Sequence, residues 1–167
     1  KSNLPMVVDA DALSISKTDR EKLFKVLKKR KKNILTPHHG EFKNLFRLNG
    51  QSKIDNALKA AKLTSSIIVY KGNDTVIASP KNQVWININA KNSLATAGTG
   101  DILAGLIAGL IAQGKKLIES CLVANWIMGE MSQNKNNVIA EDFVDQIKFY
   151  HNSLNNNWFH ISNNVSY

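Results

Sequence analysis

The sequence predicts a single α/β domain built on a mostly parallel sheet. Short apolar runs rich in β-branched residues, which are typical of buried strands, alternate with longer segments whose apolar residues recur at helical spacing. Two strand-like runs follow each other over 75–79 and 84–88, and they predict an antiparallel pair at one edge of the sheet. The chain has 167 residues, 43% of them hydrophobic, which is enough for one domain with a sizeable core.

The strands are predicted from β-branched and aromatic runs that are bounded by polar or turn residues. They are expected over 5–8, 33–36, 66–70, 75–79 and 84–88. Pro37 ends the second of these runs, because proline has no backbone N–H with which to continue a strand ladder. The segment 71–74 has the sequence Lys-Gly-Asn-Asp, which favours a tight turn after the third strand.

The helices are predicted from apolar residues that recur three or four positions apart. They are expected over 19–32, 40–49, 53–64, 101–113, 117–133 and 140–153. Thr18 and Glu21 form a capping-box pattern at the start of the first, and Gly50 is placed as the stop of the second. The domain is expected to cover 1–153, and residues 154–167 are interpreted as an Asn-rich, weakly ordered tail.

The net charge of +9 is concentrated in one segment. Residues 20–32 carry eight basic side chains against Glu21, a net charge of +7, so the rest of the chain carries only +2. A basic run can mark a nucleic-acid or acidic-partner surface, but this one has helical periodicity and no interleaved aromatic residue. We interpret it as a solvated helix face, and no nucleic-acid partner is expected.

Membrane insertion and an internal disulfide are not expected. The longest run without polar side chains, 102–112, is about half as long as a membrane helix needs to be, and the N-terminus has no signal-peptide pattern. Cys121 is the only cysteine, and it has no His or Cys neighbour at metal-ligand spacing. These features predict a soluble, cytoplasmic protein without a metal held by the protein itself.

The segment 92–101 carries the most specific signal for a binding site. Its small residues, among them Gly98, Thr99 and Gly100, let the backbone approach a ligand, and an apolar helix follows immediately. The first N–H groups of a helix have no intrahelical partner and lie at its positive dipole end, so the segment predicts an anion site. Asp101 is either an ordinary first-turn carboxylate or a general base for phosphoryl transfer. The segment lacks the Gly-Lys-Ser/Thr of a P-loop and the third glycine of a dinucleotide fingerprint.

Four motifs occur together with this segment in a recognisable order. They are Asp9-Ala10-Asp11-Ala12-Leu13, Leu35-Thr36-Pro37-His38-His39-Gly40-Glu41-Phe42, Lys71-Gly72-Asn73-Asp74-Thr75-Val76-Ile77-Ala78 and Leu94-Ala95-Thr96-Ala97-Gly98-Thr99-Gly100-Asp101-Ile102-Leu103-Ala104-Gly105. In order and approximate spacing they resemble the ADP- or ATP-dependent NAD(P)H-hydrate dehydratases over about residues 4–150. The resemblance implies a ribokinase-like three-layer sandwich, of which the N-terminal part is missing from this chain because the family's domain extends further in that direction.

The resemblance also implies an activity, the repair of damaged nicotinamide cofactor. A nucleotide, ADP in most bacterial members, drives the loss of water from the (6S)-hydrate of NAD(P)H, which restores NAD(P)H and releases AMP and phosphate. Mg²⁺ is implied together with ADP or ATP. The implied partners are an NAD(P)H-hydrate epimerase, separate or fused, and the N-terminal portion of the same domain, and a homo-oligomer is expected.

The roles of individual residues are implied by the resemblance at the matching positions. Asp101 is the implied general base. The implied contacts to the hydrated substrate are His38, Glu41, Asn44 and Asp101. The implied nucleotide-binding residues are Lys71, Gly72, Asn73, Asp74, Thr75, Ala97, Gly98, Thr99 and Gly100. Asp11 and Asn92 are further candidates, Asp11 because ligands of doubly wound sheets bind where strands end.

Each of these assignments has a simpler alternative. The 71–74 segment is also a good tight turn, His38 can be an exposed loop residue, and Glu41 can simply serve the N-terminus of the next helix. His39 and Met128 depart from the family, since they stand where proline and histidine are common. The alternative functions are a ribokinase-like kinase that phosphorylates a small alcohol, and a non-catalytic module that binds a nucleotide or nucleic acid.

Overall fold

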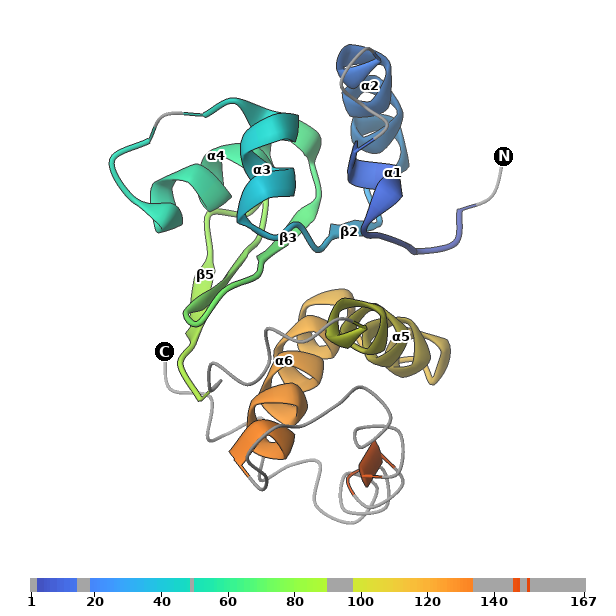
Figure 1. The fold of residues 1–167 in the computed structure, drawn as a ribbon. Helices are drawn as coiled ribbons and strands as arrows, with labels where there is room; N and C mark the ends of the chain where they lie inside the picture. Colours follow the sequence, from blue (N-terminus) through green and yellow to red (C-terminus); the bar gives the residue numbers. More distant parts are fainter. Residues whose placement is uncertain are drawn as a thin grey trace.

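A five-stranded sheet with helices on both faces forms the fold in a computed structural model of the protein (Figure 1). The structure describes residues 3–14, 19–48, 50–89, 98–133, 146, 147 and 150. Its strands are β1 (Met6–Val8), β2 (Asn33–Leu35), β3 (Ile67–Tyr70), β4 (Thr75–Ala78) and β5 (Val84–Asn87). Its helices are α1 (Asp11–Ser14), α2 (Arg20–Arg30), α3 (His39–Phe46), α4 (Lys53–Thr64), α5 (Thr99–Ala112) and α6 (Leu117–Gln133).

The strands lie in the order of the sequence, from β1 to β5. β1, β2 and β3 pair in parallel, whereas β4 is antiparallel to both of its neighbours, so every strand except β4 runs in the same direction. The prediction of a mostly parallel sheet with an antiparallel hairpin at one edge is therefore confirmed. α1 and α2 connect β1 to β2, and α3 and α4 connect β2 to β3, as expected for parallel neighbours that need a crossover.

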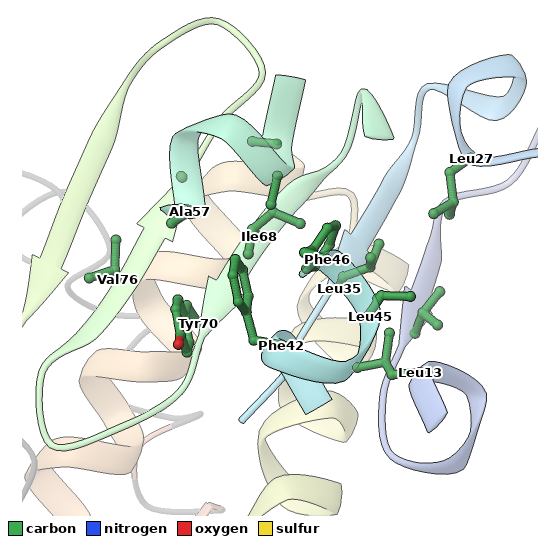
Figure 2. Packing of buried hydrophobic residues seen from close by; sticks show 14 residues of the cluster. Leu13, Leu27, Leu35, Phe42, Leu45, Phe46, Ala57, Ile68, Tyr70 and Val76 are labelled. Atoms are coloured by element: carbon green, nitrogen blue, oxygen red, sulfur yellow. The ribbon is translucent and has the colours of Figure 1, made fainter. Parts of the chain in front are cut away.

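Alternating side chains of the strands build two separate cores. On β3, Ile68 and Tyr70 pack with α1 to α4, whereas Ile67 and Val69 pack with α5 and α6. Figure 1 shows these two helical layers on opposite sides of the sheet. Figure 2 shows the first core, in which Phe42 of α3 lies against Tyr70. The three-layer arrangement implied by the resemblance is what the structure contains.

The end of α3 and the presence of α1 differ from the expectation. α3 ends at Phe46 rather than at residue 49, because Arg47 takes up the left-handed conformation (φ 51°) and caps the helix with its N–H on Lys43 O. Gly50 is therefore not the helix stop, and its N–H instead donates to Asn56 Oδ1 of α4 at 2.7 Å. The short helix α1 was not expected, since four residues are too few to show a period.

The predicted capping box of α2 falls partly outside the described residues. Asp19 is the N-cap of α2 and makes no side-chain cap hydrogen bond, whereas Thr18 is not among the described residues. Most of the predicted 140–153 helix and all of the 154–167 tail also lie outside them. None of the described helices has the length and apolar character needed to cross a bilayer.

The basic helix α2 packs through one narrow stripe. Leu27 is its one buried residue, and most of its lysines are exposed, in agreement with a solvated face. Lys28, Lys29 and Arg30 lie in the last turn, where positive charge interacts favourably with the helix dipole.

In the opposite layer, Cys121 is fully buried in α6, and this burial raises the pKa of its thiol well above the usual range.

Candidate active site

The carboxyl ends of β1, β2 and β3 are tied together at one edge of the sheet. The N–H of Thr36 donates to Val8 O at 3.1 Å, and its hydroxyl donates to the same oxygen at 3.3 Å. The N–H of Lys71 donates to Pro37 O at 2.9 Å. These bonds place the residues that follow the three strands side by side, at the edge where parallel sheets bind their ligands.

An ion pair crosses this edge from β3 to β1. Lys71 Nζ lies 2.9 Å from Asp9 Oδ1, and the two side chains are 21% and 11% exposed. Both lie close to Gly100 at the start of α5: a Cβ atom at position 100 would be 3.3 Å from Lys71 Nζ and 3.4 Å from Asp9 Oδ2. Asp9, which follows β1, and Lys71, which follows β3, thus both lie beside Gly100 in the first turn of α5.

The N-terminus of α5 has the geometry that the glycine-rich segment predicted. Gly98 is the N-cap with φ 87°, a left-handed conformation that favours glycine, and no side chain caps the helix there. Gly100 and Asp101 occupy the first turn, and the carboxylate of Asp101 is exposed. Ala97 and Asn92 lie outside the described residues, so their predicted roles stay predictions.

The segment that follows Lys71 is a tight turn held by a side chain from α4. Lys53 Nζ donates to the backbone oxygen of Asp74 at 2.6 Å and to its Oδ1 at 2.8 Å. A Cβ atom at Gly72 would lie 2.6 Å from Lys53 Nζ, so a larger residue there would displace the lysine. The hydroxyl of Thr75 closes the turn by donating to Gly72 O at 3.0 Å. Sequence reasoning missed Lys53, because nothing near it in the chain indicates a partner in this turn.

The charges around this turn also shift two pKa values. The hydrogen bond from Lys53 holds the pKa of Asp74 below its usual range. Burial, and then the negative charge of Asp74, raise the pKa of Tyr70. Tyr70 therefore stays protonated at neutral pH, and its ring lies beneath Lys53 Nζ at 4.9 Å from the ring centroid.

His38 and Glu41 form a capping box at the start of α3. His38 Nδ1 accepts from the N–H groups of Gly40 and Glu41, at 3.0 and 3.2 Å, and Glu41 Oε2 accepts from the N–H of His38 at 2.8 Å. Because Nδ1 is an acceptor here, Nε2 is the ring nitrogen left to carry a proton. Glu41 therefore caps the N-terminus of α3, and its predicted contact with the substrate stays a prediction. His38 keeps an exposed ring edge, and Asn44 is exposed one turn further along α3.

His39 joins α3 to the end of β3. Its Nδ1 lies 2.7 Å from the Tyr70 hydroxyl, and its ring stacks on the Tyr70 ring. Phe42 stacks on Tyr70 as well, with 4.1 Å between ring centroids. The histidine that replaces the family's common proline therefore has a structural role of its own.

The remaining candidates lie apart from this cluster. Asp11 is exposed as the first residue of α1, and the carboxylate that meets Lys71 belongs to Asp9. A signal for Asp9 was present in the sequence, since Asp9 and Lys71 both follow strands whose ends share an edge. The described residues contain no group of three or more His, Cys, Asp or Glu side chains that could hold a metal ion.

Comparison with known proteins shows the family to which the chain is similar. A family model described as NAD(P)H-hydrate dehydratase matches residues 1–146. The chain belongs to this family. The dehydratase fold is also found among solved structures. Two crystal structures of an ADP/ATP-dependent NAD(P)H-hydrate dehydratase from Bacillus subtilis, crystallised with ATP and Mg²⁺, superpose with TM-scores of 0.70 and 0.69 at 27% and 28% identity.

Curated relatives of the dehydratase family are also similar. An ADP-dependent (S)-NAD(P)H-hydrate dehydratase from Neisseria meningitidis is 38% identical over 130 residues, which is 75% of this chain and 43% of that protein. A bifunctional NAD(P)H-hydrate repair enzyme from Thermosynechococcus vestitus is 39% identical over 120 residues, which is 70% of this chain and 23% of that protein. The match to the Bacillus structure covers 87% of this chain and 54% of the other. This chain thus spans about half of the dehydratase fold or less.

Proposed function

We propose that this chain carries the nucleotide-dependent chemistry of an NAD(P)H-hydrate dehydratase. The observation that supports the proposal is that Lys71 and Asp9 lie beside Gly100, the residue that precedes Asp101 in the first turn of α5, in a chain of this family. A lysine ammonium and the N–H groups of a first helical turn are suited to hold a transferring phosphoryl group, because both offer positive charge to its oxygens. The adjacent carboxylate is suited to accept a proton.

In the proposed reaction Asp101 takes the proton from the hydroxyl of the hydrated nicotinamide ring. The hydroxyl oxygen then attacks the terminal phosphorus of the nucleotide, and the bond to the departing nucleotide oxygen breaks, so that ADP yields AMP. Phosphate next leaves the ring with the electron pair of its C–O bond, and the ring loses a proton to restore NAD(P)H. Phosphate is a far better leaving group than hydroxide, which explains why a nucleotide is consumed.

The turn at 71–75 is the proposed nucleotide subsite, and the start of α3 is the proposed subsite for the hydrated dinucleotide. The first is anchored by Lys53 on Asp74, so its backbone is fixed before a ligand arrives. At the second, His38 has an exposed ring and Asn44 an exposed side chain, while Glu41 fixes the capping geometry. Both subsites follow strands at the same edge of the sheet, which supports their serving one reaction.

Mg²⁺ is proposed to bind as part of the metal–nucleotide complex. The carboxylates near the start of α5 are hard oxygen donors of the kind that Mg²⁺ takes, but no described group forms a cage of three or more ligands. Mg²⁺ commonly keeps several waters and binds through substrate phosphates, so nucleotide phosphates and water suffice to hold it. When bound it neutralises phosphate charge.

The proposed partners are an NAD(P)H-hydrate epimerase and the remaining portion of the dehydratase fold. The bifunctional relatives support the first of these, and the short coverage of every relative named above supports the second. The choice between ADP and ATP, homo-oligomer formation and a cytoplasmic location stay predictions.

The proposal is tested by incubating hydrated NADH with this chain and the remainder of the fold, with and without ADP. The absorbance of the reduced nicotinamide should return only when ADP is present, and AMP and phosphate should be released in equal amounts. Return of the absorbance at the same rate without any nucleotide would contradict the proposed role of phosphoryl transfer.

Replacing Lys71 with methionine should weaken ADP binding more than it weakens binding of the hydrated dinucleotide. Methionine keeps most of the apolar stem but removes the charge that is proposed to face phosphate, and it leaves Asp9 as an unpaired anion nearby. Isothermal titration with each ligand separately measures both affinities. Lys22→Met is the matched control, since Lys22 pairs with Asp19 on an exposed face. If the dinucleotide lost more affinity than ADP, the turn at 71–75 would not be the nucleotide subsite.

A further inference from the structure

In the Asp9–Lys71 pair both side chains are largely withdrawn from water, whereas every other ion pair of the described residues has at least one partner that is 36% or more exposed. Its side chains are 11% and 21% exposed, whereas Asp74 in the Lys53 pair is 63% exposed and both partners of the Lys22–Asp19 pair are more than 60% exposed. A pair withdrawn from water to this extent loses much of its hydration. It is therefore weak evidence for stability, and another reason for its presence is needed.

The position of the pair supplies that reason. Lys71 is fixed at its backbone by Pro37, and its side chain crosses the end of β2 to reach Asp9 beyond β1. The two charged groups arrive within contact distance of the place that a Gly100 side chain would occupy. Glycine at position 100 keeps this space clear next to Asp101.

We propose that Asp9 is a positioning residue, which holds the Lys71 ammonium beside the first turn of α5, where the phosphoryl group of the nucleotide is transferred. This inference rests on the proposed function for the identity of the ligand. A free lysine side chain has four flexible carbons and many rotamers, and a carboxylate partner selects the one that places the ammonium at Gly100. Asp9 acts through Lys71 and is not assigned a contact with substrate.

The direction in which Asp9→Asn changes the affinity for ADP distinguishes a positioning role of Asp9 from an effect of its charge alone. Asp9 is an anion, so if it acted only through its charge, Asp9→Asn would strengthen the binding of anionic ADP. If Asp9 positions Lys71, the same variant should weaken ADP binding although it removes a negative charge. The two accounts therefore predict opposite changes in the dissociation constant.

The experiment is a double-mutant cycle with Asp9→Asn, Lys71→Met and the double variant, made in the protein that supplies the complete dehydratase fold. Asp9→Asn alone should raise the dissociation constant of ADP and lower kcat/KM for ADP by about tenfold or more, since misplacing a catalytic group by about 1 Å can cost about 10²-fold. In the Lys71→Met background Asp9→Asn should not weaken ADP binding further, because the group that it positions is already gone and only the negative charge of Asp9 is left to remove. Asp19→Asn, which breaks the exposed pair with Lys22, is the matched control and should change neither quantity more than about twofold.

Three results would overturn the inference. Tighter ADP binding in Asp9→Asn would show that the carboxylate acts by its charge alone. Equal effects of Asp9→Asn in both backgrounds would show that it does not act through Lys71. A shifted Mg²⁺ requirement with unchanged ADP binding in the absence of Mg²⁺ would make Asp9 a metal ligand instead. If the wild-type protein bound ADP without dehydrating hydrated NADH, the proposed function would fail, whereas the binding arm of the cycle would still decide the role of Asp9.

Discussion

Replacing Asp101 with asparagine should reduce nucleotide-dependent dehydration by about 10²- to 10⁴-fold, the loss typical of a positioned general base. Asparagine keeps the size and the hydrogen-bonding oxygen of the side chain but cannot accept the ring hydroxyl proton at neutral pH. ADP binding should stay within a few-fold of the wild-type value, because the N–H groups of the first turn of α5 are unchanged. Single-turnover kinetics and isothermal titration measure the two quantities separately.

Asp55 offers a matched control for this variant. It is the third residue of α4, as Asp101 is the third residue of α5, so Asp55→Asn removes a first-turn carboxylate from the same position in a helix. Asparagine at position 55 keeps an oxygen that can accept the hydrogen bond which the Ser52 hydroxyl donates to Asp55 Oδ2. Both substitutions should cost a similar loss of helix-dipole stabilisation, roughly 0.3–1 kcal/mol. If Asp101→Asn behaved like Asp55→Asn and kept near-normal turnover, Asp101 would be an ordinary first-turn carboxylate.

The 167-residue chain expressed alone should lack dehydratase activity, and this all-or-none loss is the second large effect expected. In the described part of the chain β1 is an edge strand of three residues, and its outer side offers backbone groups to a further strand. The match to this chain covers 43% of the Neisseria relative and 54% of the Bacillus structure, so a large part of their fold is not matched by this chain. The isolated chain should therefore be poorly soluble or oligomeric.

Coexpression with the remainder of the fold should restore both a monodisperse particle and ADP-dependent dehydration. Light scattering after size exclusion gives the particle mass, and the nicotinamide absorbance gives the activity. Mixing the two parts after separate purification is the control, since exposed strand edges that have already aggregated should not recover. A stable, fully active monomer made of this chain alone would show that the unmatched part of the relatives' fold supplies nothing essential to the reaction.

The parallel strands and the hairpin could be predicted from the sequence because the residue patterns that produce them lie within short segments of the chain. Buried strands such as β3 are continuous runs of β-branched and aromatic residues, and the periods of two and of 3.6 residues are visible within a few positions. The end of α3 was missed for a local reason too. A non-glycine residue, Arg47, adopts the left-handed capping conformation in which glycine is usual. The prediction instead placed the end of the helix at Gly50, the next glycine in the chain.

The site was only partly predictable, because its contacts join residues far apart in the sequence. Asp9 and Lys71 are separated by 62 positions, and Lys53 and Asp74 by 21, so no spacing rule connects either pair. His38 is an unusual helix cap, since its ring nitrogen accepts the backbone N–H groups that a short hydroxyl or carboxylate side chain normally accepts. The glycine-rich start of α5 was the exception, because a helix start and its small residues are adjacent in the chain.

Heavy-oxygen labelling of the ring hydroxyl tests the central claim most directly. In the proposed reaction the hydroxyl oxygen attacks phosphorus and leaves as part of phosphate, so hydrated NADH labelled at that oxygen should yield labelled inorganic phosphate, and no label should pass to the solvent water. Mass spectrometry of the released phosphate measures the transfer. A small-molecule kinase of the same fold would leave a phosphorylated alcohol and restore no NADH. If NADH were restored while the phosphate remained unlabelled, the hydroxyl would not attack the nucleotide, and the phosphoryl-transfer site described here would be wrong.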